Sequence, residues 1–280
     1  MFKIGVLSES FRKPFAESVK EAVRLGLSGL QIYAKDGAVF DGMSRAEIAE
    51  VKRILRGEGL EISALCGDFG CRMFYFPNEM REEIEREKRI LSLAKELGTD
   101  IVTTHIGVVP EDFNTKEFET MRGVCKELAD FADSAGGHFA VETGPEPSSR
   151  LKRFLDTLKS RGVGVNLDPA NLVMVIGENP ADAVYNLKDY IVHTHAKDGK
   201  MLKKTDSRRI YVPSLSHLDP VNCSEYFEEL PLGKGEVPWN EYIAALKKTG
   251  YNGYLTIERE VGANPSADIA LAAAFLRKYI

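Results

Sequence analysis

Val163-Gly-Val-Asn-Leu-Asp168 is a short apolar run that ends in a carboxylate. Three other runs have the same form, with an acidic residue or a histidine at the C-terminal end: His138-Phe-Ala-Val-Glu142, Ile191-Val-His-Thr-His195 and Tyr254-Leu-Thr-Ile-Glu258. Short runs of β-branched and apolar residues are typical of buried strands. If these four strands lie parallel, three carboxylates and one imidazole converge on one rim.

Strand-like runs alternate with longer amphipathic stretches from one end of the chain to the other. This alternation is typical of parallel βαβ units. The expected strands are Lys3–Leu7, Gly29–Tyr33, Glu61–Leu65, Asp100–His105, Phe139–Glu142, Gly164–Asp168, Ile191–His195 and Tyr254–Glu258. Eight such units predict an α/β protein with a single (β/α)8 TIM-barrel domain over residues 1–280, since such barrels typically have about 250 residues.

The stretches between the strands have the apolar spacing of three and four residues that is typical of helices. The clearest are Phe15–Leu25, Arg45–Arg56, Met80–Leu97, Phe118–Ala135, Arg150–Ser160 and Tyr242–Lys248. Glycines are expected to end several helices in the left-handed conformation: Gly26, Gly98, Gly162 and Gly250. An open doubly wound sheet would need a glycine-rich turn after the first strand, and Ser8-Glu9-Ser10-Phe11 is not one.

One connection departs from this pattern. Residues 199–237 have no clear apolar period, and the stretch Gly199–Arg209 is strongly basic. Long connections without regular structure inside compact domains are usually functional. Because this one follows the strand that ends in His195, it is predicted to be a loop or lid over a substrate.

Composition excludes some classes of function. The net charge is −5 and the pI is about 5.7, which disfavours nucleic acid as a partner. The four cysteines have no paired C-x-x-C spacing and are expected to be reduced thiols. No apolar stretch has the form of a signal segment or reaches the roughly 20 residues of a membrane span. These features predict a cytoplasmic protein, without a membrane partner, that acts on a small molecule.

Spacing supports a shared metal site. Glu142 and Asp168 are 26 residues apart and Asp168 and His195 are 27 apart, each about one βα unit, and one further unit with the long loop leads to Glu258. Three carboxylates and one imidazole suit Mn²⁺, then Mg²⁺ or Co²⁺, better than Zn²⁺. Purely structural roles are the alternative: Asp168 precedes a proline and could form a turn.

Other residues near the same rim are candidates for substrate contacts. His105 either contacts substrate or is satisfied by a backbone carbonyl. Lys197 shares the strand parity of His195 and could hold a substrate oxygen or form a salt bridge. Cys66 ends the third strand and is either a substrate contact or a small packing residue. His193 is expected to point to the opposite face from His195 and is not counted as a ligand.

These residues resemble the xylose isomerase-like TIM-barrel superfamily, in particular its sugar (phosphate) isomerase/epimerase branch, which includes ketose 3-epimerases of the tagatose/psicose type. The resemblance spans nearly the whole chain and is carried by Gly26-Leu-Ser-Gly-Leu-Gln-Ile-Tyr33, Thr104-His-Ile-Gly107, Val141-Glu142, Leu167-Asp168, His195-Ala-Lys-Asp198, Pro231-Leu-Gly-Lys-Gly-Glu236 and Leu255-Thr-Ile-Glu-Arg-Glu260. It implies that Glu142 and Glu258 are both ligands and the acid/base pair, whereas Asp168 and His195 only hold the metal. Members of the superfamily often form dimers or tetramers.

The resemblance implies proton transfer next to a substrate carbonyl through a cis-enediolate, which gives an epimer or an aldose–ketose isomer. The sequence departs from the epimerases at Asn171, where they usually have a substrate-binding histidine, and at Met201, near which they have an arginine. Asn171 is therefore a candidate substrate contact, and Lys197, Lys200 or Arg208 could take the place of the arginine. The expected substrate is a sugar or sugar phosphate.

Three other functions compete with this interpretation. A dehydratase of a sugar or inositol derivative would use the same metal and base. Endonuclease IV shares the barrel and the positions of His105 and the four candidate ligands, but it needs further histidines and an aspartate for three zinc ions, and Asn171 occupies one of those places. A sugar-binding barrel without turnover is the third alternative, although both candidate acid/base glutamates are present.

Overall fold

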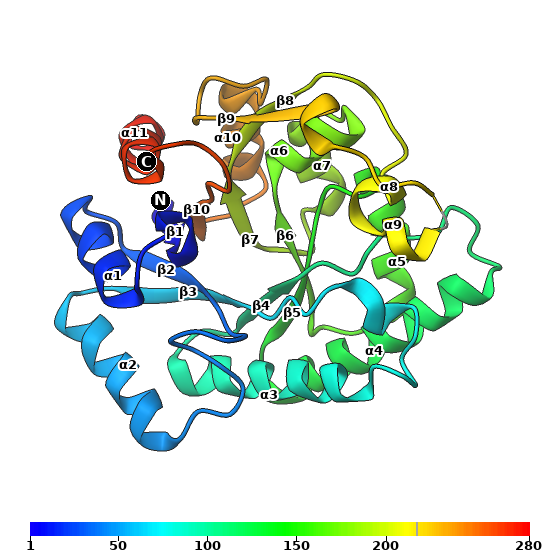
Figure 1. The fold of residues 1–280 in the computed structure, drawn as a ribbon, viewed down its shortest axis with the longest axis horizontal. Coiled ribbons are helices and arrows are strands. Elements are labelled where there is room, and N and C mark those ends of the chain that lie inside the picture. The colour runs from blue at the N-terminus through cyan, green and yellow to red at the C-terminus, as the bar shows by residue number, and fades with distance from the viewer. Residues whose placement is uncertain (217) are drawn as a thin grey trace.

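Eight parallel strands close into a barrel in the computed structural model, which describes residues 1–216 and 218–280 (Figure 1). His217, inside the predicted loop, lies outside the described residues. In barrel order the strands are β1 (Lys3–Leu7), β10 (Tyr254–Ile257), β7 (Ile191–Ala196), β6 (Val163–Leu167), β5 (His138–Glu142), β4 (Ile101–Thr104), β3 (Glu61–Cys66) and β2 (Gly29–Tyr33). The predicted (β/α)8 class is confirmed, and each predicted strand end lies within one residue of the observed end.

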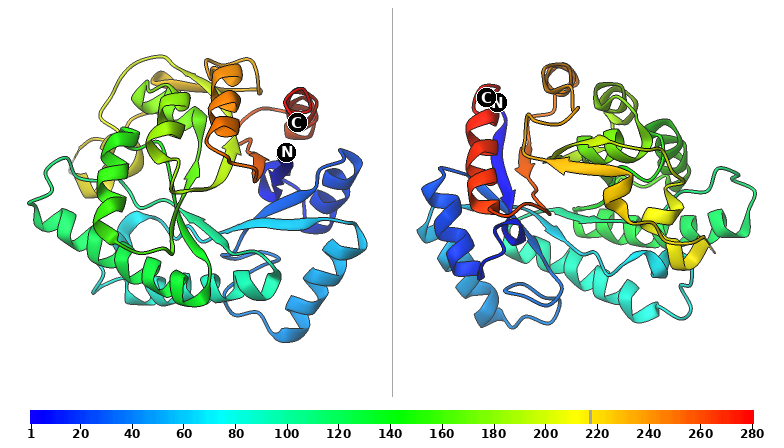
Figure 2. Two further views of the ribbon diagram at one scale, coloured as in Figure 1. Left: turned by 180° about the vertical axis from the view of Figure 1, so that it is seen from behind. Right: turned by 45° about the horizontal axis from the view of Figure 1, so that its top comes forward.

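Helices cover the outside of the barrel (Figure 2). The longer ones are α1 (Phe15–Arg24), α2 (Arg45–Gly57), α3 (Arg81–Leu97), α4 (Lys116–Ala135), α5 (Ser148–Leu158), α7 (Pro180–Leu187), α10 (Trp239–Lys248) and α11 (Pro265–Leu276). Local sequence explains their limits: α2 starts with a capping box in which Ser44 and Glu47 satisfy each other's backbone N–H groups. None of the helices that the structure describes is long and apolar enough to cross a bilayer.

The barrel interior below the rim is polar. Strand alternation directs Val163, Val165 and Leu167 of β6 toward the helices, whereas Asn166 between them points inward. Fully buried polar side chains from other strands meet it there. Asn166 Oδ1 accepts from His193 Nδ1 at 2.9 Å, and the Thr256 hydroxyl lies 2.9 Å from His193 Nε2. This network forms a fixed floor under the rim at which β5, β6, β7 and β10 end.

Gly162 does not end α5 in the left-handed conformation, contrary to the sequence prediction. The helix ends at Leu158, and the left-handed residue is Lys159, with φ 49°. A side chain at position 162 would overlap the backbone of Ala129 and Asp133 in α4. Gly162 is therefore required for close packing of α4 beside β6, whereas Gly26, Gly98 and Gly250 have the predicted positive φ.

Residues 198–237 contain short regular elements, although the sequence predicted none. They form a two-stranded antiparallel ribbon of β8 (Asp198–Met201) and β9 (Phe227–Leu230), with α8 (Arg208–Tyr211), α9 (Pro213–Ser216) and η4 (Cys223–Glu225) in the connection. Asp198 anchors the ribbon to α10, since its carboxylate accepts from Gly233 N at 2.8 Å and from Trp239 Nε1 at 2.9 Å. A side chain at Gly235 would overlap this carboxylate, which explains the glycine there.

Glu87 on α3 is fully buried, and neither of its carboxylate oxygens has a hydrogen-bond partner among the described residues. Burial raises the pKa of Glu87 well above its usual value, and the charge of Asp68 raises it further. A carboxyl whose pKa is higher in the folded than in the unfolded chain contributes stability that is full below the unfolded pKa and is lost as the pH rises through the folded pKa.

We therefore expect Glu87→Gln to raise the free energy of unfolding by about 2 kcal/mol at pH 7, because Glu87 must take up a proton when the chain folds at that pH and glutamine needs none. The difference from the parent chain should vanish below the unfolded pKa, near pH 4, and grow by up to about 1.4 kcal/mol per pH unit above it. Urea unfolding from pH 4 to 8 measures this. Glu96→Gln, at an exposed position on the same helix, is the control. Equal stability of the Glu87 variant and the parent chain at pH 7 would contradict the assignment.

Candidate metal centre and its cavity

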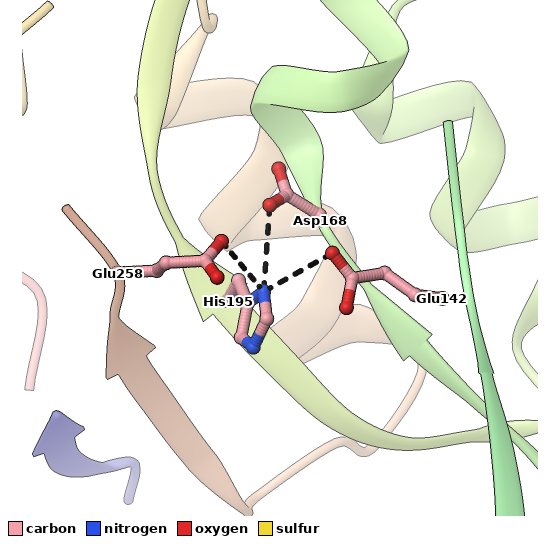
Figure 3. A group of neighbouring side chains, drawn as sticks. All are labelled: Glu142, Asp168, His195 and Glu258. Atoms are coloured by element: carbon pink, nitrogen blue, oxygen red, sulfur yellow. Dashed lines mark hydrogen bonds and ion pairs between the residues drawn. The ribbon is translucent and has the colours of Figure 1, made fainter. Parts of the chain in front are cut away.

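Four side chains meet at the C-terminal ends of neighbouring strands (Figure 3). Glu142 is the last residue of β5, Asp168 directly follows β6, His195 lies near the end of β7, and Glu258 directly follows β10. One donor atom from each lies within 4.8 Å of the donor atoms of the other three, and all four residues are buried. The convergence predicted from the strand ends is therefore present, and this cluster could hold a divalent metal ion.

Asp168 combines the turn-forming and the ligand geometry. One carboxylate oxygen, Oδ1, accepts from the backbone N–H groups of Ala170 at 2.8 Å and Asn171 at 3.0 Å, which caps the short helix α6 (Pro169–Asn171). The other oxygen, Oδ2, points to His195 Nδ1 at 3.4 Å. The two alternatives raised by the sequence are thus not exclusive, because each uses a different oxygen.

The ring of His195 is oriented by Gln31 from β2. Gln31 donates through Nε2 to Thr103, so its Oε1 is the atom that accepts from His195 Nε2, at 2.8 Å. This contact is shorter than the 3.2 Å between His195 Nε2 and Asn166 Nδ2, so Nε2 carries the proton and Nδ1 the lone pair in the neutral ring. It faces Glu142 Oε1 at 3.5 Å, Asp168 Oδ2 at 3.4 Å and Glu258 Oε2 at 3.2 Å. Three carboxylates around one lone pair repel one another unless a cation lies between them, so this donor set fits a divalent ion.

The pKa shifts of the cluster residues also indicate a need for positive charge among the three carboxylates. Burial disfavours a charge on His195, but Glu258 and Glu142 outweigh burial and raise its pKa well above the usual value. Glu258 is buried as well, yet Lys197 and His195 hold its pKa well below the usual value. A proton on His195 thus offsets part of the negative charge of the three carboxylates. A metal ion would displace that proton, so its binding should become stronger as the pH rises.

We expect Gln31→Leu to weaken Mn²⁺ binding by about 10- to 100-fold, because the His195 ring loses the acceptor that fixes its tautomer. Gln31→Glu is the matched control, since a carboxylate still accepts from His195 Nε2. Calorimetric titration of both variants with Mn²⁺ measures the effect. Parent-like affinity in the leucine variant would rule out this role for Gln31.

A cavity of about 970 Å³ opens above the cluster. Its lining includes Glu142, His195 and Glu258, and also all four residues predicted to contact substrate: Cys66, His105, Asn171 and Lys197. Residues from the 199–237 segment line its outer part, among them Tyr211, whose ring lies 5.9 Å from that of His105. The predicted substrate contacts are therefore brought together beside the four-residue cluster, under the segment that the sequence singled out.

His105 is held by a side chain rather than by a backbone carbonyl. Its Nδ1 lies 3.0 Å from Asp68 Oδ2, and its Nε2 lies 3.5 Å from Glu142 Oε1. Burial lowers the pKa of His105, but Glu142 and Asp68 outweigh burial and raise it to about 10. Asp68 was not found by the sequence reasoning, although it follows the third strand by two residues and is acidic.

Lys197 and Asn171 each contact one of the candidate acid/base glutamates. Lys197 Nζ donates to Glu258 Oε2 at 3.1 Å and also to Glu260, so it forms salt bridges. Asn171 Nδ2 donates to Glu142 Oε1 at 3.2 Å. Cys66 is buried at the cavity wall, and burial raises the pKa of its thiol well above the usual value, which leaves it unreactive.

His193 lies on the same side of β7 as His195, and the expectation that it points to the opposite face is wrong. Residues two apart in a strand share a face. The two rings are 5.9 Å apart, both inside the barrel. Burial lowers the pKa of His193 well below the usual value, which keeps it neutral in the polar floor. It is not part of the four-residue cluster.

Comparison with known protein families identifies the family of this chain. A family model described as xylose isomerase-like TIM barrel matches residues 19–279. The chain belongs to this family. The resemblance drawn from the sequence motifs is thereby confirmed. Among curated proteins, YfiH of Bacillus subtilis, an uncharacterized protein, is 27% identical over 164 residues. That match covers 55% of this chain and 51% of YfiH, so the chain spans about half the length of this curated relative.

Solved structures share the fold of this family member over its full length. A xylose isomerase domain protein from Planctomyces limnophilus has a TM-score of 0.78 at 23% identity, covering 99% of this chain and 96% of that one. A probable 3-DHS dehydratase, AsbF from Bacillus anthracis, has a TM-score of 0.75 at 18% identity, with 99% of each chain covered. A D-psicose 3-epimerase solved in the presence of D-fructose has a TM-score of 0.73 at 17% identity, again with 99% of each chain covered. At these identities the likeness concerns the fold.

Proposed function

We propose that the protein is a metal-dependent sugar isomerase or epimerase that moves a proton next to a carbonyl through a cis-enediolate. The observation that carries this proposal is the placement of Glu142 and Glu258, which reach the cluster from opposite sides of His195 (Figure 3). Two carboxylates on opposite faces of a bound sugar can remove a proton from one face and return one to the other. The likeness to a D-psicose 3-epimerase supports the same reaction class.

Glu142, Asp168, His195 and Glu258 would hold the cation, with Mn²⁺ preferred and Mg²⁺ or Co²⁺ as alternatives. When bound, such an ion supplies a Lewis acid that polarises the substrate carbonyl. Glu142 and Glu258 are the proposed acid/base pair, and Asp168 and His195 are proposed as ligands only. Lys197 and Asn171 contact the two glutamates as described above, and both are proposed, together with His105, to donate to substrate oxygens.

We also propose that residues 199–237 cover the bound substrate. The contact between Tyr211 and His105 supports this role, since the segment reaches the cavity wall beside Glu142. A cover would exclude water while the enediolate exists.

Dehydration of a sugar or inositol derivative is the second candidate. It starts with the same proton removal, and it needs an acid that protonates the departing hydroxyl group. His105 is suited to that step, because Glu142 and Asp68 favour its protonated form. Its Nε2 lies 3.5 Å from Glu142 Oε1, and both residues line the cavity. The likeness to the probable dehydratase AsbF also favours it. An endonuclease IV-like activity has less support, since Asn171 occupies the place of a zinc-binding histidine of that enzyme.

Incubation with sugars in D₂O tests the proposal. Protein purified without chelator is first analysed for metal and is then incubated with ketoses, aldoses and their phosphates. NMR should show deuterium at the carbon next to the carbonyl, with an epimer or isomer as product. Formation of a dehydrated product instead would favour the second candidate. Metal-loaded protein that exchanges no proton of any sugar would count against both.

A further inference from the structure

We propose that the cavity selects a neutral ketose that carries a second neutral group, such as another sugar ring, and that it rejects sugar phosphates. This inference rests on the proposed function and goes further, because it names the substrate class. Three observations carry it: the charge of the lining, the size of the cavity, and an apolar wall that is separate from the metal cluster.

The lining is acidic. Besides Glu142 and Glu258, it contains Asp68, Glu228, Glu229 and Glu260. Its lysine and arginine members among the described residues are Lys197 and Arg259, and both are already paired.

The charge of each of these two cations is already offset by carboxylates. Lys197 donates to Glu258 and Glu260. Arg259 donates to Glu229 at 2.5 Å and to Asp268 at 2.9 Å. His105, the other cation of the lining, is paired with Asp68 at 3.0 Å and lies 3.5 Å from Glu142. A phosphate group would bring up to two further negative charges into a lining whose positive charges are already offset, and like charges in a partly buried site repel strongly.

The basic residues of the 199–209 stretch do not change this balance. Lys200 is paired with Glu228 at 2.9 Å and Arg208 with Asp206, while Arg209 donates to a backbone carbonyl. Lys203 lies over the ring of Tyr226. None of these side chains is part of the cavity lining among the described residues. The strongly basic character of this stretch therefore does not provide a phosphate site inside the cavity.

The cavity is larger than one monosaccharide needs. A hexose has twelve carbon and oxygen atoms, and because bonded atoms pack more closely than separate molecules it fills less than the roughly 360 Å³ that twelve water molecules occupy in the liquid. The cavity holds about 970 Å³, near the upper end of ordinary ligand sites. The space that one hexose leaves is therefore large enough for a second ring of similar size.

An apolar wall lines the part of the cavity built by segments that supply none of the four cluster residues. It consists of Met174 and Val175 from the π-helical turn η3 (Leu172–Ile176), with Leu202, Ile210, Phe227 and Leu230 from the ribbon and its connection. Leu202 is 50% exposed and the last three are partly exposed. Apolar side chains that gather at a cavity and face water usually contact a ligand. The carbon–hydrogen face of a sugar ring, packed on Phe227, suits this wall.

Three compounds with one fructose core test the inference: D-fructose, D-fructose 6-phosphate and isomaltulose, in which a glucosyl group replaces the phosphate. Deuterium exchange next to the carbonyl gives kcat/KM for each compound. The free, phosphorylated and glucosylated forms of D-psicose and D-tagatose extend the test to other ketoses. We expect the glucosyl compound to exceed the free ketose by at least tenfold and the phosphate to be poorest. Equal rates for the free and glucosyl compounds, or preference for the phosphate, would overturn the inference while leaving the proposed function intact. Absence of exchange with every compound would overturn both.

Two variants locate the second group. Phe227→Ala should lower the ratio of kcat/KM for the glucosyl compound to that for the free ketose by about tenfold, as expected for loss of one hydrophobic contact. Leu202→Ala should lower it in the same direction by a smaller factor, and it avoids disturbing the paired part of the ribbon. Leu271→Ala is the matched control, because Leu271 is a similarly exposed leucine on α11, outside the cavity lining. An unchanged ratio in both wall variants would exclude this wall as the binding surface.

Discussion

Glu142→Gln and Glu258→Gln should each lower kcat by about 10³-fold or more. Each substitution keeps the size of the side chain but removes a carboxylate that accepts or returns the proton, and a positioned acid or base typically contributes about 10² to 10⁴ in rate. Both residues are also proposed ligands, so the rates must be compared at saturating Mn²⁺. Proton exchange in D₂O and product formation are the two measurements.

Proton exchange and product formation together distinguish the roles of the two glutamates. The glutamate that removes the proton should be required for exchange as well as for product, whereas the other should be required mainly for product. Glu111→Gln is the control, since the Glu111 side chain is 89% exposed and belongs neither to the four-residue cluster nor to the cavity lining. Near-parent turnover in either variant, with metal bound, would show that the acid/base assignment is wrong.

Asp168→Asn should weaken Mn²⁺ binding by at least about 100-fold while keeping the fold. The amide oxygen can still cap α6 as Oδ1 does now, but the second oxygen, which faces His195, becomes an NH₂ group that cannot bind a cation. Because Asp168 is proposed to hold the metal only, a large excess of Mn²⁺ should restore much of kcat.

A second helix cap provides the matched control for this variant. Asn179 caps α7 by accepting from Ala181 N at 2.9 Å, away from the cluster. Asn179→Ala should cost about 1 kcal/mol of unfolding free energy and leave Mn²⁺ affinity unchanged. Parent-like Mn²⁺ affinity in Asp168→Asn, measured by calorimetry, would contradict the proposed ligand set.

The strand ends could be predicted from sequence because each barrel strand has its own apolar run. Once the strands are parallel, residues at their C-terminal ends must share a rim, and Glu142, Asp168 and His195 are found there together. Whether they bind a metal is chemistry that periodicity does not determine.

Features that depend on contacts between distant segments were missed. The ribbon strands β8 and β9 have four residues each and pair across a long connection, so neither shows a periodic pattern by itself. Gly162 looks like a helix end in sequence, but its requirement comes from the backbone of α4. Gln31 lies 164 residues from His195, so only the closed barrel shows that it orients the ring.

A crystal grown with Mn²⁺ and measured near the manganese absorption edge tests the central claim most directly. The account predicts one strong anomalous peak bound by His195 Nδ1 and by one oxygen each of Glu142, Asp168 and Glu258, with Gln31 still accepting from His195 Nε2. No anomalous peak among these four side chains, or a manganese ion bound elsewhere in the barrel, would contradict it.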